Sequence, residues 1–151
     1  MRAITVGVDG SAHAQQALEW AVREAGAHHA ALQVLAVHPV ARSSWTGNPV
    51  VFQADDAAHA ETQRAAEDAV NKAIAQCGEP GPASTSVTSV NGIVAQALVE
   101  ASRESDLLVV GARGGGGFSR LTLGSVSSQV VHHAECPVVV IPHGRDTQPR
   151  H

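Results

Sequence analysis

Residues 107–126 read LLVVGARGGGGFSRLTLGSV and hold the features that decide the fold. An apolar run of strand length, Leu107 to Val110, ends at Gly111. A glycine-rich loop follows, and Gly124–Ser125 stands where a helical period begins. This strand, loop and helix form one unit of an alternation that runs through the whole chain.

The glycine-rich loop is well suited to an anion. Gly114 to Gly117 are four consecutive glycines, and a backbone without Cβ atoms can approach a ligand closely. Successive amides turned inward form an anion-binding nest, and the helix start at Gly124–Ser125 favours negative charge. The alternative interpretation is a plain flexible loop, with Ser125 as an ordinary helix N-cap.

Two other phosphate-binding motifs do not fit the spacing. A Walker A loop has a Lys between its last Gly and the Ser or Thr, and Gly124–Ser125 has no intervening residue. A dinucleotide fingerprint is expected at the first turn from strand to helix, whereas Gly111 follows a late strand.

Short apolar runs alternate with helical periods on both sides of this segment. We expect strands over residues 3–8, 32–37, 84–90, 107–110 and 138–141, with 84–90 polar at alternate positions as in an edge strand. Four helices are expected. The first has a predicted buried face of Ala14, Ala17, Leu18, Ala21, Val22 and Ala25 and a stop at Gly26, and the second, within 55–77, has Ala66, Val70, Ala73, Ile74 and Cys77 on one face. The third is predicted to bury Val94, Ala97, Leu98 and Ala101, and the fourth covers 125–133. The alternation predicts an α/β fold with a mostly parallel sheet, right-handed crossovers and helices on both faces.

A single domain accounts for this pattern. No internal repeat or linker divides residues 1–142, and 143–151 is expected to be a flexible polar tail. Residues 39–54 show no clean period and are expected to form a long loop. On that loop, Trp45 and Phe52 either cover a ligand, meet a partner or pack over a helix.

The composition excludes several classes of function. Ala and Val supply 26 and 21 of the 151 residues, while the chain has no Tyr, two Trp and two Phe, so aromatic platforms for RNA or single-stranded DNA are not expected. A net charge of -4 argues against a general DNA-binding surface. The sequence has no apolar run of membrane-spanning length, and its N-terminus has no signal-peptide pattern. With only Cys77 and Cys136, reduced thiols and a cytoplasmic location are expected.

Three motifs together resemble the ATP-binding subgroup of the universal stress protein family. That subgroup carries Gly, two residues, Gly, nine residues, then Gly-Ser or Gly-Thr, and Gly111, Gly114 and Gly124–Ser125 fit this spacing. Residues 6–11 (VGVDGS) resemble the opening strand of the family, and residues 135–140 (ECPVVV) resemble its closing strand. The resemblance covers residues 3–141 and implies one doubly wound domain whose five parallel strands have the order 3-2-1-4-5.

The implied strand order makes the first and fourth strands neighbours. Because their crossovers leave in opposite directions, the resemblance implies a ligand crevice between Asp9 and Gly111. Asp9 and Gly7 would face the adenosine end, Val37 the base, and the loop the phosphates, with Mg²⁺ arriving on the ATP. Arg113 either adds charge there or is an ordinary solvated side chain. The site residues implied in this way are Gly7, Asp9, Val37, Gly111, Ala112, Arg113, Gly114, Gly115, Gly116, Gly117, Gly124, Ser125 and Val126.

The resemblance implies a stress-response protein that binds ATP and acts as a nucleotide-dependent regulatory switch. Slow hydrolysis at most is expected, because the sequence offers no evident catalytic base. Pro39 departs from the family, since it has no N–H where a backbone group usually meets adenine. That departure motivates one alternative, an interaction module that binds no nucleotide, and the other is an ATP-using transferase. The resemblance also implies a homodimer through the strand over 138–141, and an unidentified downstream protein.

Other reactive residues have plainer explanations. The pairs His28–His29 and His132–His133 are expected to be solvated helix-end residues, because a closed zinc site needs four ligands and no such set is evident. Ser11 and Ser125 are explained as helix caps, since no nucleophile elbow surrounds them. Cys136, beside a buried strand, is expected to be a small core residue rather than a catalytic thiol.

Overall fold

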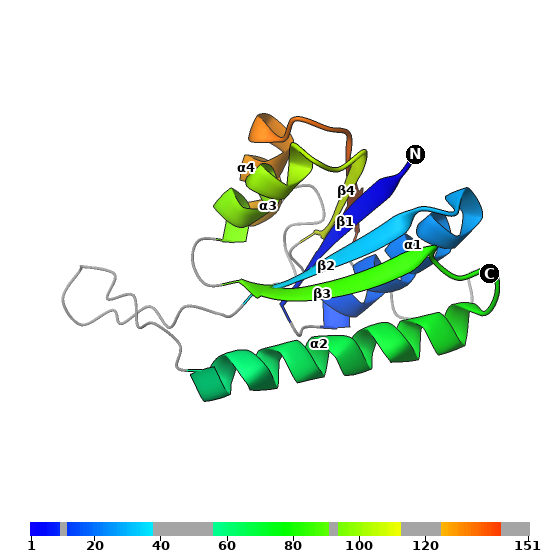
Figure 1. Ribbon diagram of the computed structural model, residues 1–151. Helices are drawn as coiled ribbons and strands as arrows, with labels where there is room; N and C mark the ends of the chain where they lie inside the picture. The colour runs from blue at the N-terminus through cyan, green and yellow to red at the C-terminus, as the bar shows by residue number, and fades with distance from the viewer. Residues whose placement is uncertain (10–11, 38–55, 91–93, 113–124, 143–151) are drawn as a thin grey trace, which may run out of the picture.

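The computed structural model describes residues 1–9, 12–37, 56–90, 94–112 and 125–142. Its strands form one parallel sheet in the order β3-β2-β1-β4-β5 (Figure 1). The strands are β1 (Ala3–Val8), β2 (Ala31–Val37), β3 (Ser84–Val90), β4 (Leu107–Gly111) and β5 (Val138–Ile141). The fold class and the strand order are therefore confirmed, while the expected loop over 39–54 and tail over 143–151 lie outside the described residues.

Helices cover the sheet on both faces, as Figure 1 shows. Between the strands lie α1 (Ala12–His28), α2 (Asp56–Cys77), α3 (Val94–Ser102) and α4 (Ser125–His133). The helices α1 and α2 pack on one face, and α3 and α4 pack on the other. Within the described residues, no helix combines the length and the apolar character that crossing a bilayer requires.

The two faces of the sheet explain why β4 is apolar throughout. Leu107 and Val109 belong to the core under α1 and α2, whereas Leu108 and Val110 belong to the core under α3 and α4. Successive side chains of a strand point to opposite faces, so a strand covered on both sides needs an unbroken apolar run. The burial of all four side chains confirms that this is a central strand.

The predicted helix faces are largely confirmed. Each of the six positions predicted to be buried on α1 is less than 9% exposed. On α2, Ala66, Val70 and Ala73 are buried, while Ile74 and Cys77 are half-buried against the same core. On α3 the prediction is only partly right. Leu98 is buried, but Ala97 and Ala101 are half-buried, and Ala95 is buried in their place. The side chain of Val94 lies outside the described residues.

The strand β3 forms one edge of the sheet, as its polar alternation predicted. Ser84, Thr85 and Ser86 are exposed, and the outer side of the strand is partly covered by α2. The side-chain amide of Gln63 on α2 donates to the carbonyl oxygen of Val87 at 3.2 Å. This bond occupies a backbone acceptor that an open edge would offer to another chain.

Gly26 does not end α1, which continues to His28, so that prediction is wrong. His29 ends the helix in the left-handed region with φ 52°, and the N–H of Ala30 donates to the carbonyl of Ala25 at 2.8 Å. Gly26 instead allows a close approach, because a Cβ there would lie 2.1 Å from the carbonyl oxygen of Pro80. A stop signal in the sequence thus marks a contact between segments that are distant in the chain.

Asp106 ties the beginning of β1 to the beginning of β4. The N–H groups of Arg2 and Ala3 donate to its Oδ2 at 2.7 and 3.0 Å, and its own N–H donates to the carbonyl of Ala3 at 2.9 Å. These two N–H donors, that of Arg2 first, hold the pKa of the Asp106 carboxyl below its usual value. The ionised carboxylate is therefore the form that folding favours.

We predict that Gly26→Ala lowers the free energy of unfolding by about 1–3 kcal/mol, because the new methyl group forces the Pro80 backbone to move. Gly81→Ala is the matched control, since a Cβ on Gly81 meets nothing within 4 Å. Urea unfolding followed by the fluorescence of the tryptophans measures both variants. Equal stability of the two variants would contradict the packing role of Gly26.

Acid should remove the contribution of Asp106 to stability. A carboxyl whose pKa is lower in the folded state stabilises the protein fully above its ordinary pKa of about 3.9, and this is lost as the pH falls through the lower folded value. Asp106→Asn should therefore lower the Tm at pH 7, and the gap to the parent protein should narrow below pH 4. Asp68→Asn, which removes an exposed carboxylate from α2, is the control. Thermal scans that show a constant gap from pH 7 to pH 3 would refute the prediction.

Candidate functional site

The sheet opens between β1 and β4 at the carboxyl ends of these strands. Their pairing runs from Ile4 and Leu107 to Val6 and Val109 and then ends. The outer ladders continue further, since β1 still pairs with β2 at Val8, and β4 still pairs with β5 at Gly111. The ends of the two central strands thus stay attached to their outer neighbours but not to each other. This is the switch point at which doubly wound sheets hold their ligands.

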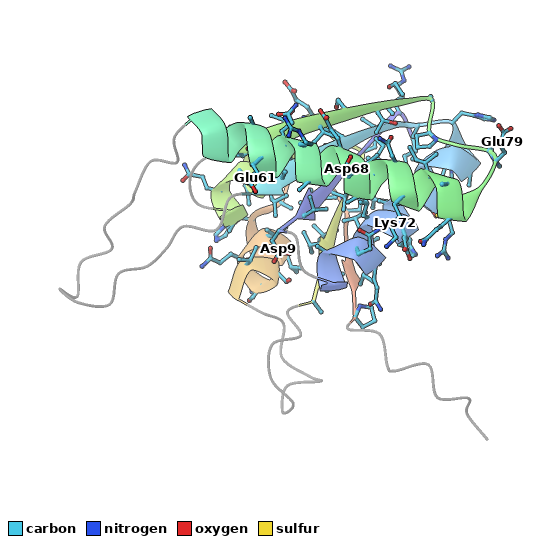
Figure 2. All side chains as sticks on the ribbon, turned by 90° about the horizontal axis from the view of Figure 1, so that it is seen from below. Asp9, Glu61, Asp68, Lys72 and Glu79 are labelled. Atoms are coloured by element: carbon cyan, nitrogen blue, oxygen red, sulfur yellow. The ribbon has the colours of Figure 1, made fainter. Side chains whose placement is uncertain are left out.

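Asp9 and Gly111 lie on the two sides of this opening. Asp9 directly follows β1 and is exposed, and Figure 2 shows that its side chain is well separated from Glu79 beyond the end of α2. Gly111 is the last residue of β4 and is half-buried. Two residues about a hundred positions apart in the chain therefore border the same opening, because β1 and β4 are adjacent.

The end of β4 is held from two directions. The N–H of Ala112 donates to the carbonyl of Ile141 at 2.7 Å, so this amide belongs to the sheet. On the other side, the hydroxyl of Ser127 donates to the carbonyl of Gly111 at 2.9 Å. Ser127 is buried, and it lies in the first turn of α4.

Ser127 is not among the residues predicted from the sequence. The available signal was weak, because it consists only of a serine one helical turn before the buried Val130. Its partner, Gly111, is 16 residues away, and no local pattern predicts that bond.

Gly7 has a packing role as well as a place on β1. A Cβ on Gly7 would lie 2.9 Å from Cδ2 of Leu98, so the missing side chain makes room for α3 against the sheet. Having no side chain, Gly7 has only its backbone to contribute at the opening.

The remaining predicted residues fall into two groups. Val37 ends β2, the strand next to β1, and Val126 is half-buried in α4 directly after Ser125, where the helix begins. These residues, with Asp9, Gly7, Gly111 and Ala112, follow or lie in elements that reach the carboxyl side of the sheet. The others, Arg113, Gly114, Gly115, Gly116, Gly117 and Gly124, lie outside the described residues.

The described histidines and cysteines make local contacts and do not form a metal site among the described residues. His28 is exposed and pairs with Glu24 at 3.0 Å, and Nδ1 of His132 lies 2.7 Å from the carbonyl of Ser128. In the part of the chain that the structure describes, no three His, Cys, Asp or Glu side chains are grouped as metal ligands. Cys77 and Cys136 are free thiols. Burial, and next the charge of Asp106, raise the pKa of Cys136, which disfavours the reactive thiolate.

Comparison with known sequences agrees with this architecture. The model of the universal stress protein family matches residues 1–142. A universal stress protein from Mycolicibacterium smegmatis is 36% identical over 144 residues, which cover 95% of this chain and 48% of that protein. The chain spans about half the length of the curated relatives that it matches.

Solved structures show the same likeness over nearly the whole chain. A universal stress protein in complex with cAMP is 27% identical with a TM-score of 0.65, and the match covers 93% of this chain and 96% of that one. UspA, a universal stress protein from Lactobacillus plantarum, is 27% identical with a TM-score of 0.65, at 93% and 97% coverage. With the strand order and the family match over residues 1–142 in agreement, this chain belongs to the universal stress protein family.

Proposed function

We propose that this chain binds an adenine nucleotide in the opening between β1 and β4, with ATP as its ligand. The observation that carries the proposal is the early end of the β1–β4 ladder, which leaves Asp9 and Gly111 on opposite sides of a gap between the carboxyl ends of the two central strands. A structural relative that is 27% identical is described in complex with cAMP, which supports a nucleotide ligand for this fold.

The phosphate end of the proposed site lies on the side of β4 and α4. A helix start directs unpaired amides and a partial positive charge outward, and α4 begins at Ser125. In our proposal the residues from Arg113 to Gly117, with Gly124, Ser125 and Val126, surround the phosphates. The amide of Ala112 is excluded from that role because it donates to Ile141. Mg²⁺ would arrive with the phosphates and would neutralise their charge when bound.

The adenosine end of the proposed site lies on the side of β1 and β2. The carboxylate of Asp9 can accept hydrogen bonds from ribose hydroxyls, and such charge-assisted bonds are stronger than neutral ones. Gly7 contributes backbone there, and Val37, at the end of β2, contributes backbone toward the base. This division places the two ends of the nucleotide on opposite sides of the opening.

We propose a regulatory role rather than dedicated catalysis. The residues assigned to the phosphates are mainly glycines, which position a ligand but hold and move no proton. Bound nucleotide would connect the ends of β1 and β4. The conformation of these strand ends would therefore depend on the concentration of nucleotide. We also propose that the chain acts in a stress response through a downstream protein partner. Its proposed location is the cytoplasm, where ATP is abundant.

We predict that the purified protein binds Mg-ATP with one site per chain, and that Asp9→Asn weakens this binding by about tenfold or more because a charge-assisted bond is lost. Asp68→Asn, on the exposed side of α2 and labelled with Asp9 in Figure 2, should bind like the parent protein. Isothermal titration with ATP, ADP, AMP, cAMP and GTP measures the affinities, and denatured protein is assayed for co-purified nucleotide. No released nucleotide together with no binding heat would refute the proposal, and rapid product formation would indicate a transferase or hydrolase instead.

The strand β5 presents an open edge for a second copy. The N–H groups of Leu108 and Ala112 donate to the carbonyls of Pro137 and Ile141 at 3.0 and 2.7 Å. Because alternate residues of a parallel strand face the same neighbour, Val138 and Val140 direct their backbone groups away from β4. All four side chains of β5 are partly exposed. We propose that β5 pairs with β5 of a second chain.

We predict a dimer at micromolar concentration and a monomer for Val140→Pro, because proline removes the outward N–H and cannot extend the ladder. Thr85→Pro places the same residue on the exposed edge β3 and should leave the dimer intact. Sedimentation equilibrium distinguishes the two states. A monomeric parent protein, or equal dissociation of both variants, would contradict the assignment of the interface.

A further inference from the structure

A buried hydroxyl joins the two ends of the glycine-rich segment. Ser127 is 2% exposed, and it donates to the carbonyl of Gly111 at 2.9 Å. Gly111 is the last residue of β4, and Ser127 is the third residue of α4. The bond therefore connects the last residue of the strand to the first turn of the helix.

The position of this bond matters because β1 gives no support to β4 here. The β1–β4 pairing ends at Val109, two residues before Gly111. Beyond that point the end of β4 depends on β5, through Ile141, and on α4, through Ser127. The hydroxyl thus holds a carbonyl on the strand that borders the opening.

Apolar packing also anchors α4. Val130 is fully buried in the core under α3 and α4, and the N–H of Ala134 continues the helical bonding to Val130 at 2.8 Å. In the first turn, Ser127 makes the described polar link to the sheet. Val126 also packs against this core from the first turn, so the hydrogen bond of Ser127 is the directional contact that places the helix start relative to β4.

We propose that Ser127 is a positioning residue for nucleotide binding, which fixes the start of α4 against the end of β4 and so sets the geometry of the phosphate end. This inference rests on the proposed function. Ser127 acts through Gly111 and the helix start rather than by contact with the ligand. Its effect should consequently fall on the phosphates and spare the adenosine, which the other side of the opening holds.

The test compares ATP with adenosine in Ser127→Ala. The affinity for ATP is measured by titration, and the affinity for adenosine by displacement of a fluorescent ATP analogue. We expect ATP binding to weaken by roughly fivefold to tenfold, as for the loss of one buried hydrogen bond, and adenosine binding to change by less than about twofold. Ser127→Cys keeps a weaker donor, so its affinity for ATP should lie between those of the parent protein and the alanine variant. The cysteine variant also serves as the test if the alanine variant does not fold.

Ser102→Ala is the matched control. Ser102 is 1% exposed, donates to the carbonyl of Val99 and accepts from the N–H of Glu135, so its loss also removes buried hydrogen bonds. It lies at the end of α3, shortly before β4 begins and so near the amino ends of the strands, whereas Asp9 and Gly111 lie at their carboxyl ends. We expect a lower Tm for both alanine variants, but an unchanged ratio of ATP to adenosine affinity for Ser102→Ala.

Three outcomes separate this inference from the proposed function. A parent protein that binds neither ATP nor the analogue refutes the proposed function itself. A parent protein that binds ATP, with Ser127→Ala unchanged or weakened equally for ATP and adenosine, refutes the positioning role alone. A loss confined to ATP, graded through the cysteine variant and absent from the Ser102 control, supports it.

Discussion

The right-handedness of crossover connections is the constraint on which the rest of this structure depends. The chain moves from β1 to β2 and β3 with α1 and α2 on one face, then returns to β4 and β5 with α3 and α4 on the other face. The connections that leave β1 and β4 therefore diverge. No strand can fill the space between their ends, and the ladder between them ends at Val6 and Val109. The candidate site follows from the path of the chain before any side chain is considered.

Small residues allow the layers to meet closely enough for this path. Gly7 gives space to Leu98 of α3, and Gly26 gives space to the Pro80 backbone on the other face. The buried side of α1 is mostly alanine, so the helix lies close to the strands. Closely packed layers transmit small displacements, because protein interiors have few voids to absorb them. The abundance of Ala and scarcity of aromatic residues thus have a structural purpose.

The sequence predicted local features far better than distant contacts. Short apolar runs placed β1 at Ala3–Val8 and β5 at Val138–Ile141, where the structure has them, because such a run is a property of neighbouring residues. The strand order came from the family resemblance, since periodicity carries no information about which strands pair. Gly26 was misjudged and Ser127 was missed for one reason. Their partners, Pro80 and Gly111, lie 54 and 16 residues away, and only the folded chain brings them together.

The two edges of the sheet are chemically unequal, and this has a consequence for growth. Gln63 occupies the carbonyl of Val87 on β3, whereas Val138 and Val140 on β5 direct their backbone groups away from β4. In the proposed dimer through β5 each contact uses the same surface of both copies and closes on itself, so growth by repeated addition would also require pairing at β3. Gln63 occupies one backbone acceptor at that second edge, and so makes the addition of a further chain there less favourable.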